Sequence, residues 1–280
     1  MPNTNPATIN KKELNKKLSI AKKTSWTNYA FFIGACKKNI KKLSELERLP
    51  GCAGIKMFMG SSTGKLLVSE EKDVELTLKN CKRRIWIGLN NKSKLFTDFP
   101  NKTKVLSNFY EFKHNLPLCS KNKKIGYTAR IESRKNVHYL DNHQSFILSN
   151  PYDWKNITEN SNFNFSKCKF YQWDTKIHDM FMKKDWFISH SCHTKEPFGY
   201  SIFQSIDYGK LPIIHSDWGD VDYKYKASSK KEFEEMLTQI ENDSFNENEY
   251  NFNILKEYML KFSNKERWTK RIKTNFEILN

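Results

Sequence analysis

Long apolar runs are missing from this chain of 280 residues, and its first residues contain no hydrophobic stretch. A membrane-spanning helix needs roughly 20 consecutive apolar residues, and a secretory signal peptide needs an apolar segment near the start of the chain. The sequence offers neither, so we expect a soluble, cytoplasmic protein without a transmembrane segment.

Dense metal-binding or disulfide motifs are missing as well. The six cysteines are scattered along the chain without a Cys-x-x-Cys pair, which argues against a zinc ribbon and against a disulfide framework. The seven histidines all lie beyond residue 113. The front of the chain therefore has no imidazole to offer a metal ion, and we expect reduced thiols throughout.

Acidic residues are scarce at the front of the chain. Residues 1–85 contain 18 Lys and Arg against 7 Asp and Glu, whereas the rest contains 30 against 24, which together give the formal charge of +17. Lysine predominates over arginine, and no nucleic-acid-binding motif is present, so we expect no specific nucleic-acid partner. Weak, salt-sensitive polyanion binding remains open. Most of the excess stands in pairs typical of solvated helix faces, namely Lys11/Lys12, Lys16/Lys17, Lys22/Lys23, Lys37/Lys38 and Lys41/Lys42.

Short β-rich apolar runs alternate with segments of helical period, which predicts the α/β class with parallel sheets. The front should hold three strands, at 28–34, 53–59 and 84–89, and helices near 10–24, 37–48 and 70–82. An eight-stranded barrel needs about 250 residues, so residues 1–87 are predicted to form a partial (β/α) barrel fragment. Residues 88–104, polar and interrupted by Pro100, are the expected junction.

Residues 105–280 are predicted to form a Rossmann-like parallel-sheet domain that ends in helices. A helix is expected at 229–240, and two more from about residue 247. The expected strands are 105–109, 124–129, 145–149, 168–173, 186–190 and 211–215.

The motifs MPNT and GIKMFMGSSTG, in that order, resemble the dihydroorotases of the amidohydrolase superfamily. The resemblance covers residues 1 to about 85 and implies that Asn3 contacts the substrate. It also implies that Lys56, when carboxylated, bridges two zinc ions at the end of a strand. Gly88 stands where the family has a metal-binding histidine, so zinc is expected only if the dihydroorotase hypothesis holds. Otherwise Lys56 is an ordinary lysine at a strand end, and Asn3 and Lys56 are vestigial residues without a function.

The segment IGYTARIESRKN places Arg130 and Lys135 after a strand, five residues apart. It resembles the Gly-Arg-x-x-x-x-Lys-Gly pattern in the donor-binding, C-terminal domain of GT-B glycosyltransferases. The resemblance implies that the two cations hold the diphosphate of a nucleotide sugar, whose negative charge grows as the glycosidic bond breaks. The alternative is a pair of surface cations at a helix start.

A second segment, EPFGYSIFQSIDYGKLPII, is similar to the Glu-x-x-Gly…Glu…Gly-x-Pro signature of the same enzymes. It implies that Glu196 is the catalytic residue that contacts the donor sugar. Gly199 belongs to the turn whose backbone N–H groups meet the phosphates at a helix N-terminus. Gln204 stands where the family has a ribose-binding Glu, so one charge-assisted contact is lost. The alternative is a capped helix between two strands.

Two histidines, His190 and His193, are expected on the loop just before Glu196. From there they could touch the donor or a leaving oxygen. The alternative is that both are simply loop residues.

These resemblances favour a nucleotide-sugar-binding domain that takes part in retaining glycosyl transfer to an unknown acceptor, with no cofactor required. GT-B enzymes react between two domains, and the acceptor domain is missing, so the chain is expected to be incomplete. One alternative is a dihydroorotase-like zinc amidohydrolase of pyrimidine biosynthesis. The other is a chimeric, non-functional fusion product.

Overall fold

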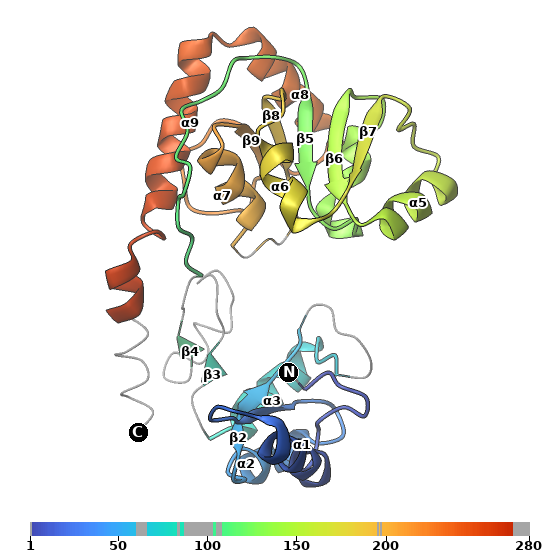
Figure 1. Cartoon of the computed structure of the whole chain (residues 1–280), viewed down its shortest axis with the longest axis vertical. Helices are drawn as coiled ribbons and strands as arrows, with labels where there is room; N and C mark the ends of the chain where they lie inside the picture. The colour runs from blue at the N-terminus through green and yellow to red at the C-terminus, as the bar shows by residue number, and fades with distance from the viewer. Residues whose placement is uncertain are drawn as a thin grey trace. The chain divides into compact units, whose positions relative to one another are not determined.

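The computed structural model describes residues 2–59, 66–82, 85–86, 103–104, 108–194, 196 and 198–270. Contacts divide the chain into two compact units (Figure 1). The first comprises residues 1–106 with residues 272–280, and the second comprises residues 107–271. Most of the expected junction at 88–104 lies outside the described residues.

The first unit contains two small parallel sheets with helices beside them. Strand β1 pairs with β2, and β3 pairs with β4, both in parallel. In chain order the elements are α1 (Lys11–Thr24), β1 (Phe31–Gly34), the 3-10 helix η1 (Ile40–Lys42), α2 (Leu43–Leu46), β2 (Cys52–Lys56), α3 (Glu71–Asn80), β3 (Ile85–Trp86) and β4 (Thr103–Lys104).

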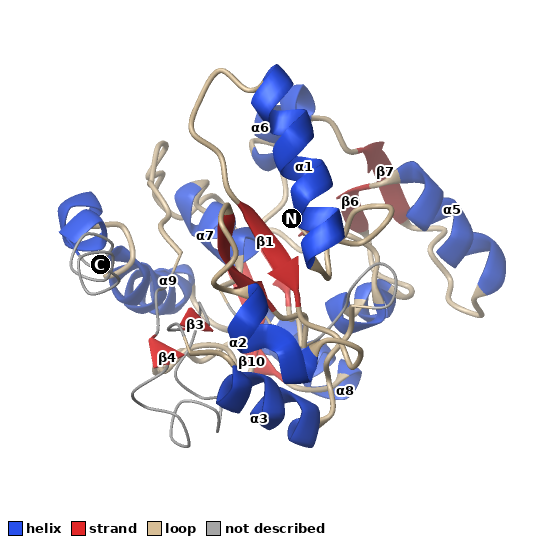
Figure 2. Ribbon diagram, turned by 90° about the horizontal axis from the view of Figure 1, so that it is seen from below, coloured by secondary structure: helices blue, strands red, loops and turns tan. Residues whose placement is uncertain are grey.

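Helix α1 begins at a side-chain cap and packs on the β1–β2 sheet. The Asn10 side chain accepts a hydrogen bond from the backbone N–H of Glu13 at 3.0 Å, which satisfies one of the free donors of the first turn. On the inner side of the helix, Leu14 is fully buried against Ile33 and Cys52. Figure 2 shows α1 beside β1, with α2 and α3 in the same unit.

The second unit is built on a six-stranded sheet in which every neighbouring pair is parallel. The strand order is β10-β9-β8-β5-β6-β7, so the two halves of the sheet grow outward from the central pair β5 and β8. The strands are β5 (Ile125–Thr128), β6 (Ser145–Ser149), β7 (Cys168–Gln172), β8 (Ile188–Ser191), β9 (Leu211–His215) and β10 (Lys226–Ala227).

Helices cover this sheet and close the end of the unit. Trp186 is buried beside Leu148, Phe181 and Tyr208, and this cluster holds α6 against the sheet (Figure 1). The helices are η2 (Ser133–Lys135), η3 (Val137–Leu140), α5 (Pro151–Asn160), α6 (Thr175–Met182), α7 (Tyr200–Asp207), α8 (Lys230–Asn242) and α9 (Phe245–Leu260), and residues 265–270 are also helical. None of the helices in the described part of the chain is long and apolar enough to cross a bilayer.

The segment that leads into this sheet is tied to the end of α7 by one buried carboxylate. The Asp207 side chain accepts hydrogen bonds from the backbone N–H groups of Lys113, His114 and Asn115 at 3.2, 2.9 and 2.7 Å. The hydroxyl of Tyr110 donates a fourth at 3.1 Å. Because a buried carboxylate is stable only when its oxygens are satisfied, this set fixes residues 110–115 against α7.

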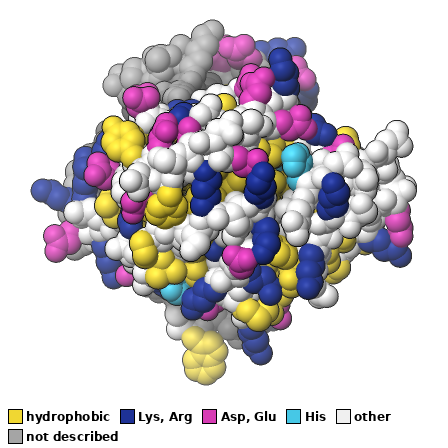
Figure 3. Space-filling model, turned by 90° about the horizontal axis from the view of Figure 1, so that it is seen from above, with side chains coloured by type: hydrophobic (Ala, Val, Ile, Leu, Met, Phe, Trp, Pro, Cys, Tyr) yellow, Lys and Arg dark blue, Asp and Glu magenta, His cyan; other side chains and the backbone are white. Residues whose placement is uncertain are grey.

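Basic side chains are interspersed with acidic ones on the second unit. Lys123 pairs with Glu241 at 2.9 Å, and Lys124 pairs with Asp185 at 2.5 Å. Figure 3, which shows one face of the molecule, has Asp and Glu side chains around and between the Lys and Arg side chains. The face drawn there is of mixed charge.

The predicted α/β class with parallel sheets and C-terminal helices is confirmed, and the described residues of the first unit form no closed barrel. Most other predicted bounds shift by at most three residues, and three predicted elements differ in more than their bounds. The expected helix at 37–48 consists of the short η1 and α2, and the expected strand at 84–89 is described only at β3. The strand expected at 105–109 is wrong for residues 108–109, which are irregular, and residues 105–107 lie outside the described part.

Candidate functional site

The two central strands of the six-stranded sheet, β5 and β8, mark the point where the chain reverses the direction in which it adds strands. From β5 the chain adds β6 and β7 on one side, and then returns to add β8, β9 and β10 on the other. In open parallel sheets such a switch point leaves a crevice outside the carboxyl ends of the two strands. The segments that follow β5 and β8 contain Arg130, Lys135 and Glu196, so the topology brings both predicted motifs to this edge.

The segment after β5 is held to the segment after β8 by Asn136. This residue has φ 52°, in the left-handed region that Asn tolerates better than most residues. Its side-chain amide donates to the Cys192 carbonyl at 2.9 Å and to Thr194 Oγ1 at 3.2 Å. The Thr194 N–H donates in turn to the Arg134 carbonyl at 2.9 Å. These bonds set the direction of the neighbouring Lys135.

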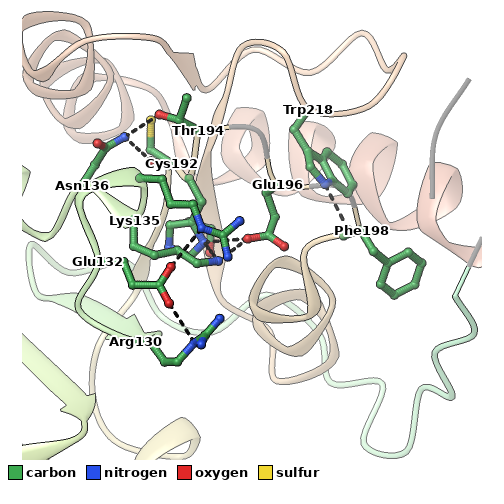
Figure 4. Close-up of polar contacts among 12 residues, drawn as sticks. Arg130, Glu132, Lys135, Asn136, Cys192, Thr194, Glu196, Phe198 and Trp218 are labelled. Carbon is green, nitrogen blue, oxygen red and sulfur yellow. Dashed lines mark hydrogen bonds and ion pairs between the residues drawn. The ribbon is translucent and has the colours of Figure 1, made fainter. Parts of the chain in front are cut away.

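Lys135 points at Glu196 (Figure 4). Its Nζ forms an ion pair and hydrogen bond with Glu196 Oε2. Both side chains are largely buried, with 11% and 15% of their surfaces exposed. A charged pair in such surroundings keeps most of its electrostatic strength because little water screens it. The structure thus brings together two of the predicted site residues, which lie 61 positions apart in the sequence.

His193 is buried next to the pair of Lys135 and Glu196. Its Nδ1 lies 3.4 Å from Lys135 Nζ and 3.8 Å from Glu196 Oε2. Burial holds the pKa of His193 well below its usual value, and the positive charge of Lys135 lowers it further. The imidazole is therefore neutral at pH 7, and its Nδ1 accepts from Lys135. Nε2 is then the protonated nitrogen, and it is buried with no partner among the described residues.

Arg130 does not join the ion pair of Lys135 and Glu196 among the described contacts, and its predicted contact with a diphosphate stays a prediction. Its side chain is 71% exposed, and its Nε pairs with Glu132 at 3.1 Å instead of reaching Glu196. Arg134 pairs with the same carboxylate at 2.9 Å. Burial alone would raise the pKa of Glu132, but the hydrogen bond from Arg134 and the charges of Arg130 and Lys135 lower it. The positive charges of Arg130, Arg134 and Lys135 thus all act on the Glu132 carboxylate.

Gly199 caps α7 in a conformation that other residues rarely adopt. Its φ is 80°, and a Cβ there would come within 2.8 Å of Ile202 Cδ1 and 2.9 Å of Trp218 Nε1. Trp218 Nε1 donates to the Phe198 carbonyl at 3.0 Å (Figure 4). A glycine is required here because both the backbone angle and the space exclude a side chain, and it positions the N-terminus of α7 next to Glu196.

Gln204 lies farther along α7 and is half-buried. Burial lowers the pKa of His178 on α6, and an interaction with the Gln204 side chain opposes that shift. The Gln204 amide therefore already has a neighbour within the second unit. Its predicted contact with a ribose stays a prediction.

The two residues predicted from the dihydroorotase resemblance lie in the first unit. Lys56 ends β2, is half-buried, and has its Nζ 5.2 Å from the centre of the Phe58 ring. Asn3 is exposed and lines a cavity with Thr4, Lys37 and Leu66. Gly88 lies outside the described residues. Within the described part of the chain, no three His, Cys, Asp or Glu side chains come together as a metal site.

Three features of the site were not predicted from the sequence. The sequence places His190 both in the strand predicted at 186–190 and on the following loop; it lies within β8, and the contact of its buried Nε2 with the Asn136 carbonyl at 2.9 Å was not predicted. Asn136 has a left-handed backbone at the position where the glycosyltransferase pattern has Gly after Lys. Because Asn tolerates this conformation better than most residues, the Asn at this position could have predicted the left-handed turn. Glu132 lies among three basic residues in the sequence, and this pattern could have predicted that it forms ion pairs with them.

Comparison with known proteins gives a partial similarity in sequence. No family model matches the chain. A dihydroorotase of Methanosarcina mazei is 40% identical over 82 residues, which make up 29% of this chain and 18% of that enzyme. The chain thus matches less than a fifth of the length of this relative.

Comparison of structures gives a similarity in fold. The apo form of the lipopolysaccharide outer core galactosyltransferase WaaB superposes with a TM-score of 0.61 at 12% identity, over 95% of this chain and 79% of WaaB. The pneumococcal O-GlcNAc transferase GtfA, in complex with UDP and GlcNAc, superposes with a TM-score of 0.48 at 14% identity, over 70% of this chain and 45% of GtfA. The superposition on WaaB shows that the fold is similar to that of GT-B glycosyltransferases.

Proposed function

We propose that the second unit binds a nucleoside diphosphate sugar at the carboxyl edge of β5 and β8, and that the chain serves glycosyl transfer. The observation that carries the proposal is the largely buried pair of Lys135 and Glu196 at the switch point of the sheet. Such crevices are where open parallel sheets bind nucleotides. The GT-B-like fold agrees with this position.

The pair is suited to exchange partners when the donor enters. A diphosphate oxygen is negatively charged like the Glu196 carboxylate, so it can replace that carboxylate at Lys135 Nζ and keep the lysine paired in a partly buried place. Glu196 is then free to accept hydrogen bonds from the hydroxyls of the donor sugar. In this proposal one ion pair connects phosphate binding with sugar recognition.

The remaining predicted residues surround that exchange. Arg130 is exposed and can turn from Glu132 toward the outer phosphate, while the N-terminus of α7 behind Gly199 presents backbone N–H groups. Gln204 would accept from the ribose. The two cations stabilise the leaving diphosphate, so the proposed reaction requires no metal ion. The motif resemblance implies that the anomeric configuration is retained.

The proposal extends to the organisation of the chain. We propose that residues 105–280 supply the nucleotide-sugar-binding domain, that 88–104 join it to a dihydroorotase-like fragment at 1–87, and that the two parts differ in descent. The 82-residue match to a dihydroorotase supports the last point. The acceptor is unknown, and full catalysis would need an acceptor site as well.

A panel of uridine and guanosine diphosphate sugars tests the binding site. We expect one of them to raise the melting temperature of the wild-type protein, and Arg130→Ala and Glu196→Ala to reduce that shift. Lys155→Ala, on α5 with 73% of its side chain exposed, is the matched control and should respond like wild type. Equal shifts in all four proteins would remove the proposed site. No shift with any sugar would favour a non-functional fusion product.

A dihydroorotase-like zinc amidohydrolase is the second candidate, and the sequence match alone favours it. It predicts two zinc ions per chain, bound through Lys56, and hydrolysis of a cyclic amide. Zinc analysis of the purified protein and of Lys56→Ala distinguishes the two candidates. Two zinc ions that are lost in the variant would support hydrolysis over glycosyl transfer.

A further inference from the structure

Helix α1 presents a face on which all charged side chains are lysines. Positions three and four apart fall on the same side of a helix, so its outward side collects most of the basic residues, while Leu14 and Ala21 face inward. The one acidic residue of the helix, Glu13, is 9% exposed and pairs with Lys16 at 3.2 Å. The exposed lysines of this face are Lys11, Lys12, Lys16, Lys22 and Lys23.

An exposed aromatic residue follows this face directly. Trp26 is 100% exposed, and every residue from 22 to 30 is exposed. Two further apolar side chains near it are open to solvent, Ile20 at 58% and Tyr29 at 38%. Covering a fully exposed tryptophan removes apolar surface from water and gains free energy, so a partner that covers Trp26 and is also attracted to lysines would bind through both effects.

We propose that α1 and residues 22–30 form a docking surface for an anionic lipid membrane. Tryptophan prefers the headgroup level of a bilayer, where its ring meets acyl chains and its N–H stays hydrated. Clustered lysines add attraction to anionic headgroups. The mixed charge on the face drawn in Figure 3 would not give this attraction, whereas the α1 face has no exposed acidic residue.

A nucleic acid is a less suitable partner for the same surface. Recognition of phosphate and bases relies on the planar arginine side chain, and single-strand binding uses a basic groove lined by several stacking rings. Helix α1 contains no arginine. Residues 22–30 offer two separate aromatic rings, of which Trp26 is the one that is fully exposed.

Co-sedimentation of the full chain with vesicles tests the proposal. The vesicles contain phosphatidylcholine with about one third phosphatidylglycerol, or phosphatidylcholine alone. We expect binding only to the anionic vesicles, and release when salt is raised from about 0.1 M to about 0.5 M. Lys22→Gln/Lys23→Gln should weaken binding by about fivefold for each lysine removed. Lys155→Gln/Lys176→Gln, in the second unit, is the matched control and should bind like wild type.

The tryptophan has its own test. Trp26→Ala should lower the partition coefficient about tenfold, while Trp173→Ala, at another exposed tryptophan, leaves it unchanged. Brominated lipid should quench part of the wild-type fluorescence, and Trp26→Phe should remove that part while vesicle binding persists. Both Trp26 variants should keep the wild-type melting temperature, because the side chain makes no packing contact in the free protein.

Three results would overturn the proposal. The first is equal binding to neutral and anionic vesicles, or none to either. The second is a fall in melting temperature for Trp26→Ala, which would show that the ring packs within the chain. The third is tighter binding of single-stranded RNA than of anionic vesicles, with the same dependence on Lys22 and Lys23.

Discussion

Replacing Lys135 with Ala should separate the role of this lysine in the free protein from the role that we propose for it in donor binding. In the free protein it neutralises Glu196, and in the proposed complex it holds the diphosphate. The variant leaves the Glu196 carboxylate largely buried and without its cation. Both stability and donor binding should therefore fall, each for its own reason.

The size of each effect follows from the burial of the pair. Removing one partner of a fully buried pair costs about 3–5 kcal/mol, and the partial exposure of these side chains reduces that to about 2 kcal/mol. A unit of this size should then melt about 4–8 °C lower. Loss of a charge-assisted hydrogen bond to phosphate costs about 1.5–3 kcal/mol, which weakens donor binding by about 10–150-fold.

Calorimetric titration with the best-binding nucleotide sugar, together with thermal unfolding, measures both quantities. In Lys135→Ala/Glu196→Gln the unpaired carboxylate is gone, so stability should largely recover while donor affinity stays low. Glu196→Gln alone should bind the free diphosphate at least as well as wild type, but lose preference for the sugar-bearing form. If the double variant regains donor affinity along with stability, Lys135 acts on folding alone and the partner exchange is refuted.

Three other predictions concern the scaffold around the site. Burial lowers the pKa of His190 from 6.5 to about 4, so between these pH values only the unfolded chain binds a proton at this residue. The free energy of unfolding should therefore fall by about 1.4 kcal/mol for each pH unit of acidification in this range. Denaturant unfolding at several pH values should show a weaker pH dependence of this free energy for His190→Phe. Gly199→Ala should cost more stability than Gly219→Ala, because both have positive φ but only Gly199 would bring a Cβ within 3 Å of other atoms; equal losses would contradict this. Asp207→Asn should cost about 2 kcal/mol and speed proteolysis at residues 110–115, because an amide cannot accept all four hydrogen bonds; an unchanged cleavage rate would refute the anchoring role.

The sequence predicted the elements of the second unit well because its strands are short, apolar and separated by helices of clear period. Strands β6 and β9 have the predicted bounds, and β5 is one residue shorter at each end. The helix predicted at 37–48 was less accurate, because the segment forms only the short helices η1 and α2. Before them, the Asn39 side chain accepts a hydrogen bond from the Cys36 backbone N–H. No periodic pattern reports such a local hydrogen bond.

The candidate site could be predicted in part. Lys135 and Glu196 belong to recognisable segments, but their contact depends on β5 and β8 becoming neighbours, which is a property of the sheet order. The direction of Arg130 follows from its pairing with Glu132, a choice among exposed rotamers that residue spacing does not determine. The burial of His190 was missed because its partner is a backbone carbonyl, supplied only by the left-handed turn at Asn136.

A crystal structure with a uridine or guanosine diphosphate sugar bound tests the donor site without relying on a variant. We predict a phosphate oxygen at Lys135 Nζ, with Glu196 turned toward the hydroxyls of the sugar. A nucleotide bound at another place, with the ion pair of Lys135 and Glu196 intact, would contradict the proposed function.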